Sequence, residues 1–95
     1  MGQIVEVLFV NFGESEQDFC LPLLKELRKR NVACEMYPSS VKLQKQMKYA
    51  NDKNIPFVAI VGESELESGN IVLKNMETGE QVTLSKNELL AKWQK

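Results

Sequence analysis

Two cysteines, Cys20 and Cys34, carry the most reactive side chains of this 95-residue chain, which contains no histidine. They do not form a Cys-x-x-Cys pair. Without histidine they lack the partner that would complete a zinc site or a Cys–His nucleophile pair. A structural disulfide needs an oxidising compartment, which nothing in the sequence indicates. We therefore expect two reduced, buried thiols that pack as small apolar side chains, and no metal site.

Three carboxylates and one strand-to-helix turn are the other groups with chemical potential. Glu63, Glu65 and Glu67 alternate in one segment, but no histidine or further acid accompanies them, so a solvated loop is favoured over a metal site. Asn11-Phe12-Gly13 stands where small α/β proteins often bind phosphate, although a single glycine also fits an ordinary turn. The sequence has neither a Walker-type phosphate loop nor a Gly-x-Gly-x-x-Gly fingerprint. We expect no catalytic residue and no cofactor in this chain.

The composition, 43% hydrophobic and 26% charged, is typical of one globular domain. No apolar run approaches the roughly 20 residues that span a bilayer, and residues 1–4 do not begin a signal peptide. We expect a cytoplasmic location without membrane attachment. The net charge of −1 argues mildly against nucleic acid, because free-standing nucleic-acid binders are usually basic. Only a local cluster of lysines would support such a role.

Apolar runs predict three strands. Residues 4–10 and 56–62 are nearly continuous apolar runs, as in strands that are buried on both faces of a parallel sheet. Residues 32–37 alternate between apolar and polar side chains, so one face of that strand is expected to be wetter.

Two helices are predicted between these strands. The first has an apolar face at helical spacing: Phe19, Leu23, Leu24 and Leu27. Pro22 is tolerated if Asp18 caps this helix; otherwise the helix begins near Ser15 and kinks at the proline. The second helix, capped within residues 38–40 and closed by Asn54, has a predicted buried stripe: Leu43, Met47 and Ala50.

The last third of the chain predicts a hairpin and a final helix. Residues 63–68 form a short helical or turn segment, and residues 70–75 and 81–84 flank a glycine-containing turn. Ser85 and Glu88 form a capping box that opens a helix carrying a core tryptophan, Trp93. The order of elements predicts an α/β fold, a three-layer α/β/α sandwich around a mixed five-stranded sheet. We expect residues 1–95 to form a single domain.

Three stretches of the sequence resemble a known protein family. Residues 45–50 (KQMKYA), 62–69 (GESELESG) and 72–81 (VLKNMETGEQ), in this order and at this spacing, resemble the C-terminal anticodon-binding domain of histidyl-tRNA synthetases, which are class II aminoacyl-tRNA synthetases. The resemblance covers nearly the whole chain and implies the same fold. It also implies binding to the anticodon stem-loop of a histidine-specific tRNA.

This chain differs from the enzymes of that family in one respect, because the catalytic domain is absent from it. We expect no aminoacylation and no ATP turnover by these 95 residues alone. The resemblance implies that the parent protein is an ATP-binding histidine–tRNA ligase of protein biosynthesis and that it forms a homodimer. Within that protein, the partner of this domain would be the catalytic domain. Either the chain is an excised fragment of such a ligase, or it stands alone.

The resemblance implies three contacts to anticodon bases, by Ser40, Glu65 and Lys74. Carboxylates accept hydrogen bonds from the amino groups of bases, and lysines donate to base acceptors or to phosphate. Each residue has a simpler alternative. Ser40 would cap the second helix, Glu65 would be an exposed loop acid, and Lys74 would point into water from its strand.

Phosphate contacts are expected from lysines of the second helix. Lys42 and Lys45 share a face opposite Leu43 and Met47, and Lys48 lies one step round; the alternative is a solvated helix face. Gln46 matches the family motif but fits a packing role equally well. Tyr37 is a candidate for stacking on a base, although packing at the rim of the core is favoured.

Two functions of different classes remain open at this point. The first is the tRNA-binding module of an aminoacyl-tRNA ligase, which the Gly62–Gly69 loop and Lys74 favour. The second is a protein-interaction or dimerisation module derived from a synthetase, which the slightly negative net charge favours.

Overall fold

The computed structural model describes residues 5–93. Its secondary structure follows the predicted order, with these bounds: β1 Val7–Phe9, α1 Glu14–Lys29, β2 Cys34–Met36, α2 Leu43–Asp52, β3 Phe57–Ile60, α3 Glu63–Ser68, β4 Asn70–Asn75, β5 Gln81–Ser85 and α4 Lys86–Lys92. The strands form one sheet in the order β2-β1-β3-β4-β5. β1 is parallel to β2 and β3, whereas β4 is antiparallel to β3 and β5. The predicted mixed five-stranded sheet is confirmed.

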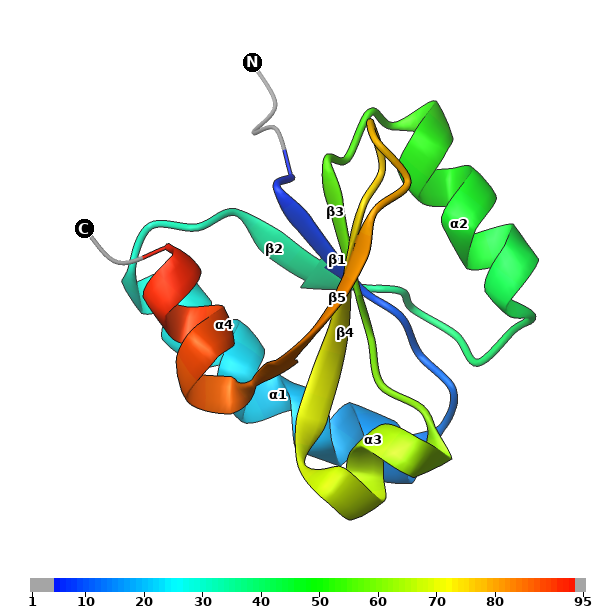
Figure 1. The fold of residues 1–95 in the computed structure, drawn as a ribbon. Helices are drawn as coiled ribbons and strands as arrows, with labels where there is room; N and C mark the ends of the chain where they lie inside the picture. The colour runs from blue at the N-terminus through cyan, green and yellow to red at the C-terminus, as the bar shows by residue number, and fades with distance from the viewer. Residues whose placement is uncertain (1–4, 94–95) are drawn as a thin grey trace.

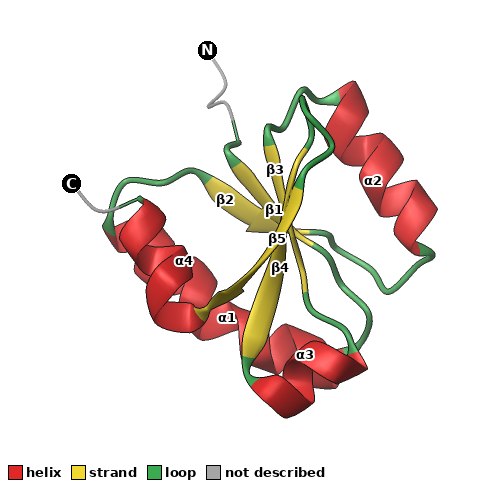
Figure 2. Ribbon diagram, in the orientation of Figure 1, coloured by secondary structure: helices red, strands yellow, loops and turns green. Residues whose placement is uncertain are grey.

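Helices lie on both faces of this sheet (Figure 1). α1 and α4 lie together on one face, α2 lies on the other, and α3 packs against α1 beyond the end of β3. Figure 2 shows the sheet between these two helical layers. The three-layer α/β/α arrangement is therefore confirmed as well.

The larger core lies between the sheet and the helices α1 and α4. Alternate side chains of β1 and β4 point into it, as the two-residue period of a strand requires: Val7, Phe9, Ile71 and Leu73. Cys20 and Cys34 are buried in the same core with free thiols. Trp93 packs edge-on against Phe57 with ring centroids 5.4 Å apart, and its indole Nε1 donates to the Oε2 of Glu6 over 3.1 Å.

The smaller core lies beneath α2 and has a polar centre, Gln46. This side chain is 0% exposed. Its Oε1 accepts from the backbone N–H of Asn11 over 2.7 Å, and its Nε2 donates to the carbonyl oxygens of Asn11 and Val41 over 2.8 and 2.9 Å. The Asn11 side chain in turn donates to the carbonyl oxygen of Tyr37 over 3.1 Å. This network, the Gln46 clamp, joins α2 to the segment that leaves β1 and to the segment that leaves β2.

The clamp changes which residues α2 buries. Gln46 and Ala50 are the buried residues of this helix, whereas Leu43 is 36% exposed. The prediction that Leu43, Met47 and Ala50 form the buried stripe is therefore wrong at Leu43, which lies in the first turn of α2. The hydrophobic pattern predicted the wrong buried residue because the buried position is occupied by the Gln46 amide, whose hydrogen bonds are satisfied.

The alternative start of α1 near Ser15 is confirmed to within one residue, whereas the cap at Asp18 and the cap of α2 within residues 38–40 are wrong. α1 begins at Glu14, because the carbonyl oxygen of Gly13 already accepts from Gln17 over 2.9 Å; the cap at Asp18 is excluded, and the exposed Pro22 lies inside the helix. α2 is preceded by Lys42, which makes no side-chain cap, so Ser40 does not cap it.

The C-terminal third agrees with the sequence more closely. Ser85 Oγ accepts from the backbone N–H of Glu88 over 3.1 Å, and Glu88 Oε1 accepts from that of Ser85 over 2.8 Å, which confirms the capping box. α3 ends at Gly69, whose φ of 77° lies in the left-handed region that favours glycine. The first strand is shorter than predicted, and Ile4 lies outside the described residues.

Replacing Gln46 by leucine should destabilise the fold at nearly constant side-chain volume. The substitution leaves the buried N–H and C=O of Asn11 without partners, and an unsatisfied buried polar group costs roughly 1–3 kcal/mol. Urea denaturation of Gln46→Leu measures the loss. Gln44→Leu, two residues away and exposed, is the control and should change the free energy of unfolding by no more than about 0.5 kcal/mol. Equal stability of the two variants would contradict the role of the clamp.

The Cys20 thiol should make stability fall at alkaline pH. Burial, with a smaller contribution from the charge of Glu16, raises the pKa of this thiol from 9.0 to about 12. The unfolded chain therefore releases the proton first, so the stabilisation is complete below pH 9.0 and is lost as the pH rises towards about 12. Above pH 9.0 the free energy of unfolding of the wild type should fall more steeply than that of Cys20→Ala, by up to about 1.4 kcal/mol per pH unit. Parallel slopes in denaturation at several pH values would show that Cys20 is not buried as described.

Candidate nucleic-acid interface

A groove of about 690 Å³ separates α2 from the part of the sheet formed by β3, β4 and β5. It exists because the Gln46 clamp and the apolar contacts of α2 lie over β1 and β3, while β4 and β5 extend beyond the helix. Ile60 and Val72, which are paired across β3 and β4, line its sheet side. The groove is larger than the hollow of about 610 Å³ beside β2 and the hollow of about 230 Å³ near Asn54.

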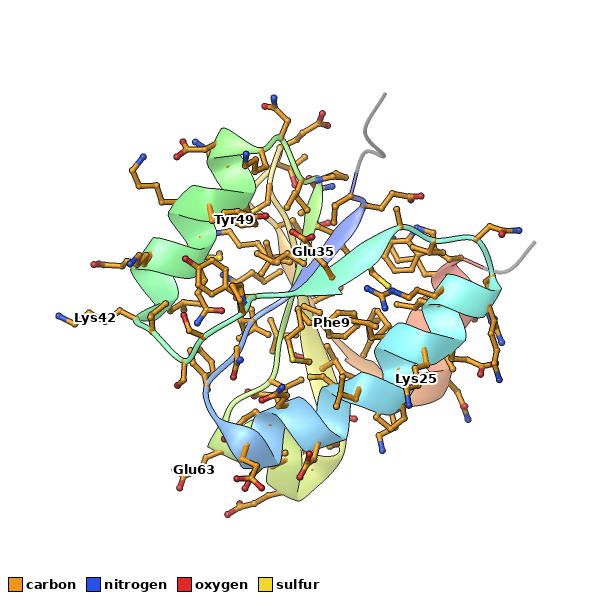
Figure 3. All side chains as sticks on the ribbon, turned by 180° about the vertical axis from the view of Figure 1, so that it is seen from behind. Phe9, Lys25, Glu35, Lys42, Tyr49 and Glu63 are labelled. Carbon is orange, nitrogen blue, oxygen red and sulfur yellow. The ribbon has the colours of Figure 1, made fainter. Side chains whose placement is uncertain are left out.

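α2 presents one continuous face to this groove. Gln44, Met47, Lys48 and Asn51 all line it, and their spacing of i, i+3, i+4 and i+7 places them on one side of a helix. Lys42 and Lys45 do not line the groove. Both are exposed, and Figure 3 shows Lys42 pointing away from the body of the protein. The three predicted phosphate contacts therefore occupy different sides of α2, with Lys48 facing the groove.

Two lysines border the groove, Lys48 from α2 and Lys74 from β4. The Lys48 ammonium lies 2.9 Å from the Asp52 carboxylate one turn later, and this hydrogen bond raises the pKa of Lys48. Such exposed i,i+4 pairs contribute little to stability, so the ammonium can exchange Asp52 for another anion. Lys74 is half-buried and is in no ion pair with any residue that the structure describes. Both positive charges are thus available to an anionic ligand.

Glu65 is held by its own helix. Its Oε1 accepts from the backbone N–H of Gly62 over 2.8 Å, as part of a capping interaction at the start of α3. Ser40 is exposed in the loop before α2. Both residues follow the carboxyl ends of parallel strands, since Ser40 comes after β2 and Glu65 after β3.

Lys74 is not beside Glu65. It pairs with Val58 near the start of β3, whereas Glu65 lies beyond the end of that strand. The two candidate base contacts therefore lie towards opposite ends of the sheet rather than side by side. The antiparallel direction of β4 carries Lys74 back towards the opposite end of the sheet.

Gln46 and Tyr37 are engaged in packing. Gln46 is buried in the clamp, so it does not present its amide to a ligand. Tyr37 packs edge-on against Tyr49 with ring centroids 5.3 Å apart. The Tyr49 hydroxyl donates to the Oε1 of Glu35 over 2.7 Å, which raises the pKa of Tyr49; Figure 3 shows Tyr49 and Glu35 pointing towards each other. These contacts fix α2 against β2.

The groove also contains residues that the sequence did not single out, the amide side chains of Gln44, Asn51 and Gln81. The spacing of Gln44 and Asn51 along α2 is visible in the sequence. Nothing in the sequence indicates that this face of α2 stands opposite β5, because that placement depends on tertiary packing.

Two further features concern the described part of the chain as a whole. Residues 5–93 include no group of three or more cysteine, aspartate and glutamate side chains placed to hold a metal ion. None of the helices described there is long and apolar enough to cross a bilayer.

Residues 5–95 match the family model of the anticodon binding domain. The chain belongs to this family. The anticodon-binding domain is 57% identical over 86 residues to a histidine–tRNA ligase of Phocaeicola vulgatus, and that match covers 90% of this chain and 19% of the ligase. It is 49% identical over 85 residues to a histidine–tRNA ligase of Bacteroides fragilis, again with 90% of this chain and 19% of the ligase covered. The domain therefore spans about a fifth of the length of these relatives.

A solved structure has the same fold as this anticodon-binding domain. The histidyl-tRNA synthetase from Nostoc superimposes with a TM-score of 0.88 at 24% sequence identity, and the match covers 95% of this chain and 22% of that one. The fold expected from the three sequence stretches is thus confirmed.

Glu65 should contribute to stability through its cap, independently of any ligand. Glu65→Ala removes the acceptor for the Gly62 N–H and should cost roughly 0.5–2 kcal/mol, whereas Glu65→Gln keeps an Oε1 acceptor at the same position. Thermal denaturation of both variants, with the exposed Glu67→Ala as control, measures the difference. If Glu65→Ala and Glu67→Ala lowered the midpoint equally, the cap would have no role of its own.

Proposed function

We propose that this chain is the tRNA-binding module of a histidine–tRNA ligase and that it binds the anticodon stem-loop of a histidine-specific tRNA. The observation that carries the proposal is the family match over residues 5–95. Relatives of 57% and 49% identity that are histidine–tRNA ligases support the amino-acid specificity. The interaction-module alternative has no comparable support.

The groove beside α2 supports binding of an RNA loop rather than of a duplex. RNA loops are recognised through unstacked bases together with phosphate contacts from lysine and arginine. In this proposal Lys48 and Lys74 lie next to the bound loop, and Lys74 donates to a base or to phosphate. Lys42 and Lys45, on the outer side of α2, contact only the RNA backbone.

This domain covers 19% of each of the two ligase relatives, so the proposal also includes a longer parent protein. A catalytic domain elsewhere in that protein would bind ATP, histidine and the acceptor end of the tRNA. This domain would hold the anticodon and raise its effective concentration. The proposal includes a homodimeric, cytoplasmic parent; these 95 residues contribute no catalytic group and no cofactor to it.

Ser40 and Glu65 remain candidates for base contacts at the carboxyl end of the parallel strands. One carboxylate oxygen of Glu65 is used by the cap, so its other oxygen would face the base. Glu65→Gln is the appropriate variant, because it preserves the cap while it removes the charge.

Binding should be tested by titrating the domain with a stem-loop carrying the histidine anticodon and with a loop of scrambled sequence, at low salt. Lys45→Gln and Lys48→Gln should weaken binding to both loops alike, because each removes a sequence-independent phosphate contact. Each should also reduce the slope of log K against log salt by about 0.7–0.9. Lys25→Gln is the matched control, since Lys25 is exposed on α1 across the sheet (Figure 3).

The base contact of Lys74 has a different signature. Lys74→Ala should cost roughly 1–3 kcal/mol on the matched loop and much less on the scrambled loop. If the wild-type domain bound neither loop at low salt and high protein concentration, the tRNA-binding proposal would fail. The interaction module would then take its place.

A further inference from the structure

The groove beside α2 has three amide side chains at its rim, Gln44 and Asn51 from α2 and Gln81 from β5. All three are exposed. None of their side-chain N–H or C=O groups is hydrogen-bonded to another residue of the described range, in contrast to the amides of Gln46 and Asn75 nearby. These amides are therefore free to pair with a ligand that has both donors and acceptors.

The floor between these amides is apolar. Met47 and Met76 lie on it together with Ile60 and Val72. Methionine side chains adapt their shape and make favourable contacts with aromatic rings. A flat ring with hydrogen-bonding edges would thus find an apolar contact for its face and amides for its edges.

Charge at the groove favours an anion. Lys48 and Lys74 line it, and none of its lining residues is an aspartate or a glutamate, although the chain has 13 acids against 12 basic residues. The volume of about 690 Å³ falls within the roughly 300–1,000 Å³ of pockets that hold small molecules, so one nucleotide has room. By contrast, the hollow of about 610 Å³ beside β2 contains Glu35, and its Arg28 is already bound to the carbonyl oxygen of Cys34 over 3.0 Å.

We propose that this groove is a base-recognition subsite in which one unstacked base of a bound RNA loop lies on Met47 and Met76. Asn51, Gln81 and Gln44 hydrogen-bond to the edges of the base, as amides do with nucleobases. Lys48 contacts a neighbouring phosphate, and Lys74 donates to the base, as in the proposed function. The assignment rests on the proposed function and deepens it, because it places sequence discrimination in this groove and on residues other than Ser40 and Glu65.

The test compares Asn51→Leu and Gln81→Leu with Asn87→Leu, which replaces an exposed amide on α4 across the sheet. Each variant is titrated with the histidine-anticodon stem-loop and with stem-loops in which one loop nucleotide at a time is changed or made abasic. For one loop position, Asn51→Leu and Gln81→Leu should each lower the ratio of matched to mismatched affinity by roughly fivefold or more. Their salt slopes should equal that of the wild type, and Asn87→Leu should behave as the wild type does.

A measurement on the unmodified domain guards against misfolded variants. On addition of the matched stem-loop, the side-chain NH₂ resonances of Gln44, Asn51 and Gln81 should shift in a ¹⁵N-correlation spectrum, and that of Asn87 should not. If the wild type bound the matched stem-loop while these resonances stayed in place, or while the leucine variants kept full discrimination, the subsite would be refuted and the proposed function would stand. If the wild type bound no stem-loop at all, the proposed function would fail as well, and a protein partner would become the candidate occupant.

Discussion

The buried amide of Gln46 is the interaction on which the shape of the functional surface depends. Its three hydrogen bonds, to the backbone N–H and C=O of Asn11 and to the C=O of Val41, fix where α2 crosses the sheet. A buried polar group is tolerated only when it is fully paired, so this geometry allows little variation. α2 is thereby held over β1 and β3, and the face of β4 and β5 beside it stays open as a groove.

The distribution of charge follows from the same arrangement. The first turns of α1 and α3 are acidic, with Glu14 and Glu63 exposed there, and these two helices pack together away from the groove (Figure 1). The groove has lysines and no carboxylate in its lining. A net charge of −1 therefore does not oppose anion binding, because screening limits the reach of surface charges to roughly 10 Å.

Much of the fold could be predicted from local sequence patterns, and the predictions that were wrong have specific physical causes. The order of elements along the chain, the hairpin and the Ser85–Glu88 capping box depend on local hydrophobic patterns and on short-range hydrogen bonds, and these appear as expected. Two predicted helix caps were wrong, because Gly13 rather than Asp18 precedes α1, which begins near Ser15 as the alternative had it, and because Ser40 does not cap α2. The prediction that Leu43 is buried was wrong because hydrophobic spacing does not distinguish a helix side chain that lies over the sheet from one that lies beyond it. Gln46 was open between a contact and a packing role, and only its bonds to a residue 35 positions earlier decide for packing.

By itself, the sequence determined the fold class, the family resemblance and the cluster of lysines within residues 42–48, because periodicity, turn residues and motif spacing are local properties of the chain. Only the tertiary structure decided that Lys48 borders a groove while Lys42 does not, and that Lys74 lies far from Glu65. It alone brought Asn51 opposite Gln81, 30 positions later. The physical reason is that the direction of the strands and the buried Gln46 clamp determine which distant side chains lie next to each other. Neither feature produces a periodic pattern in the sequence.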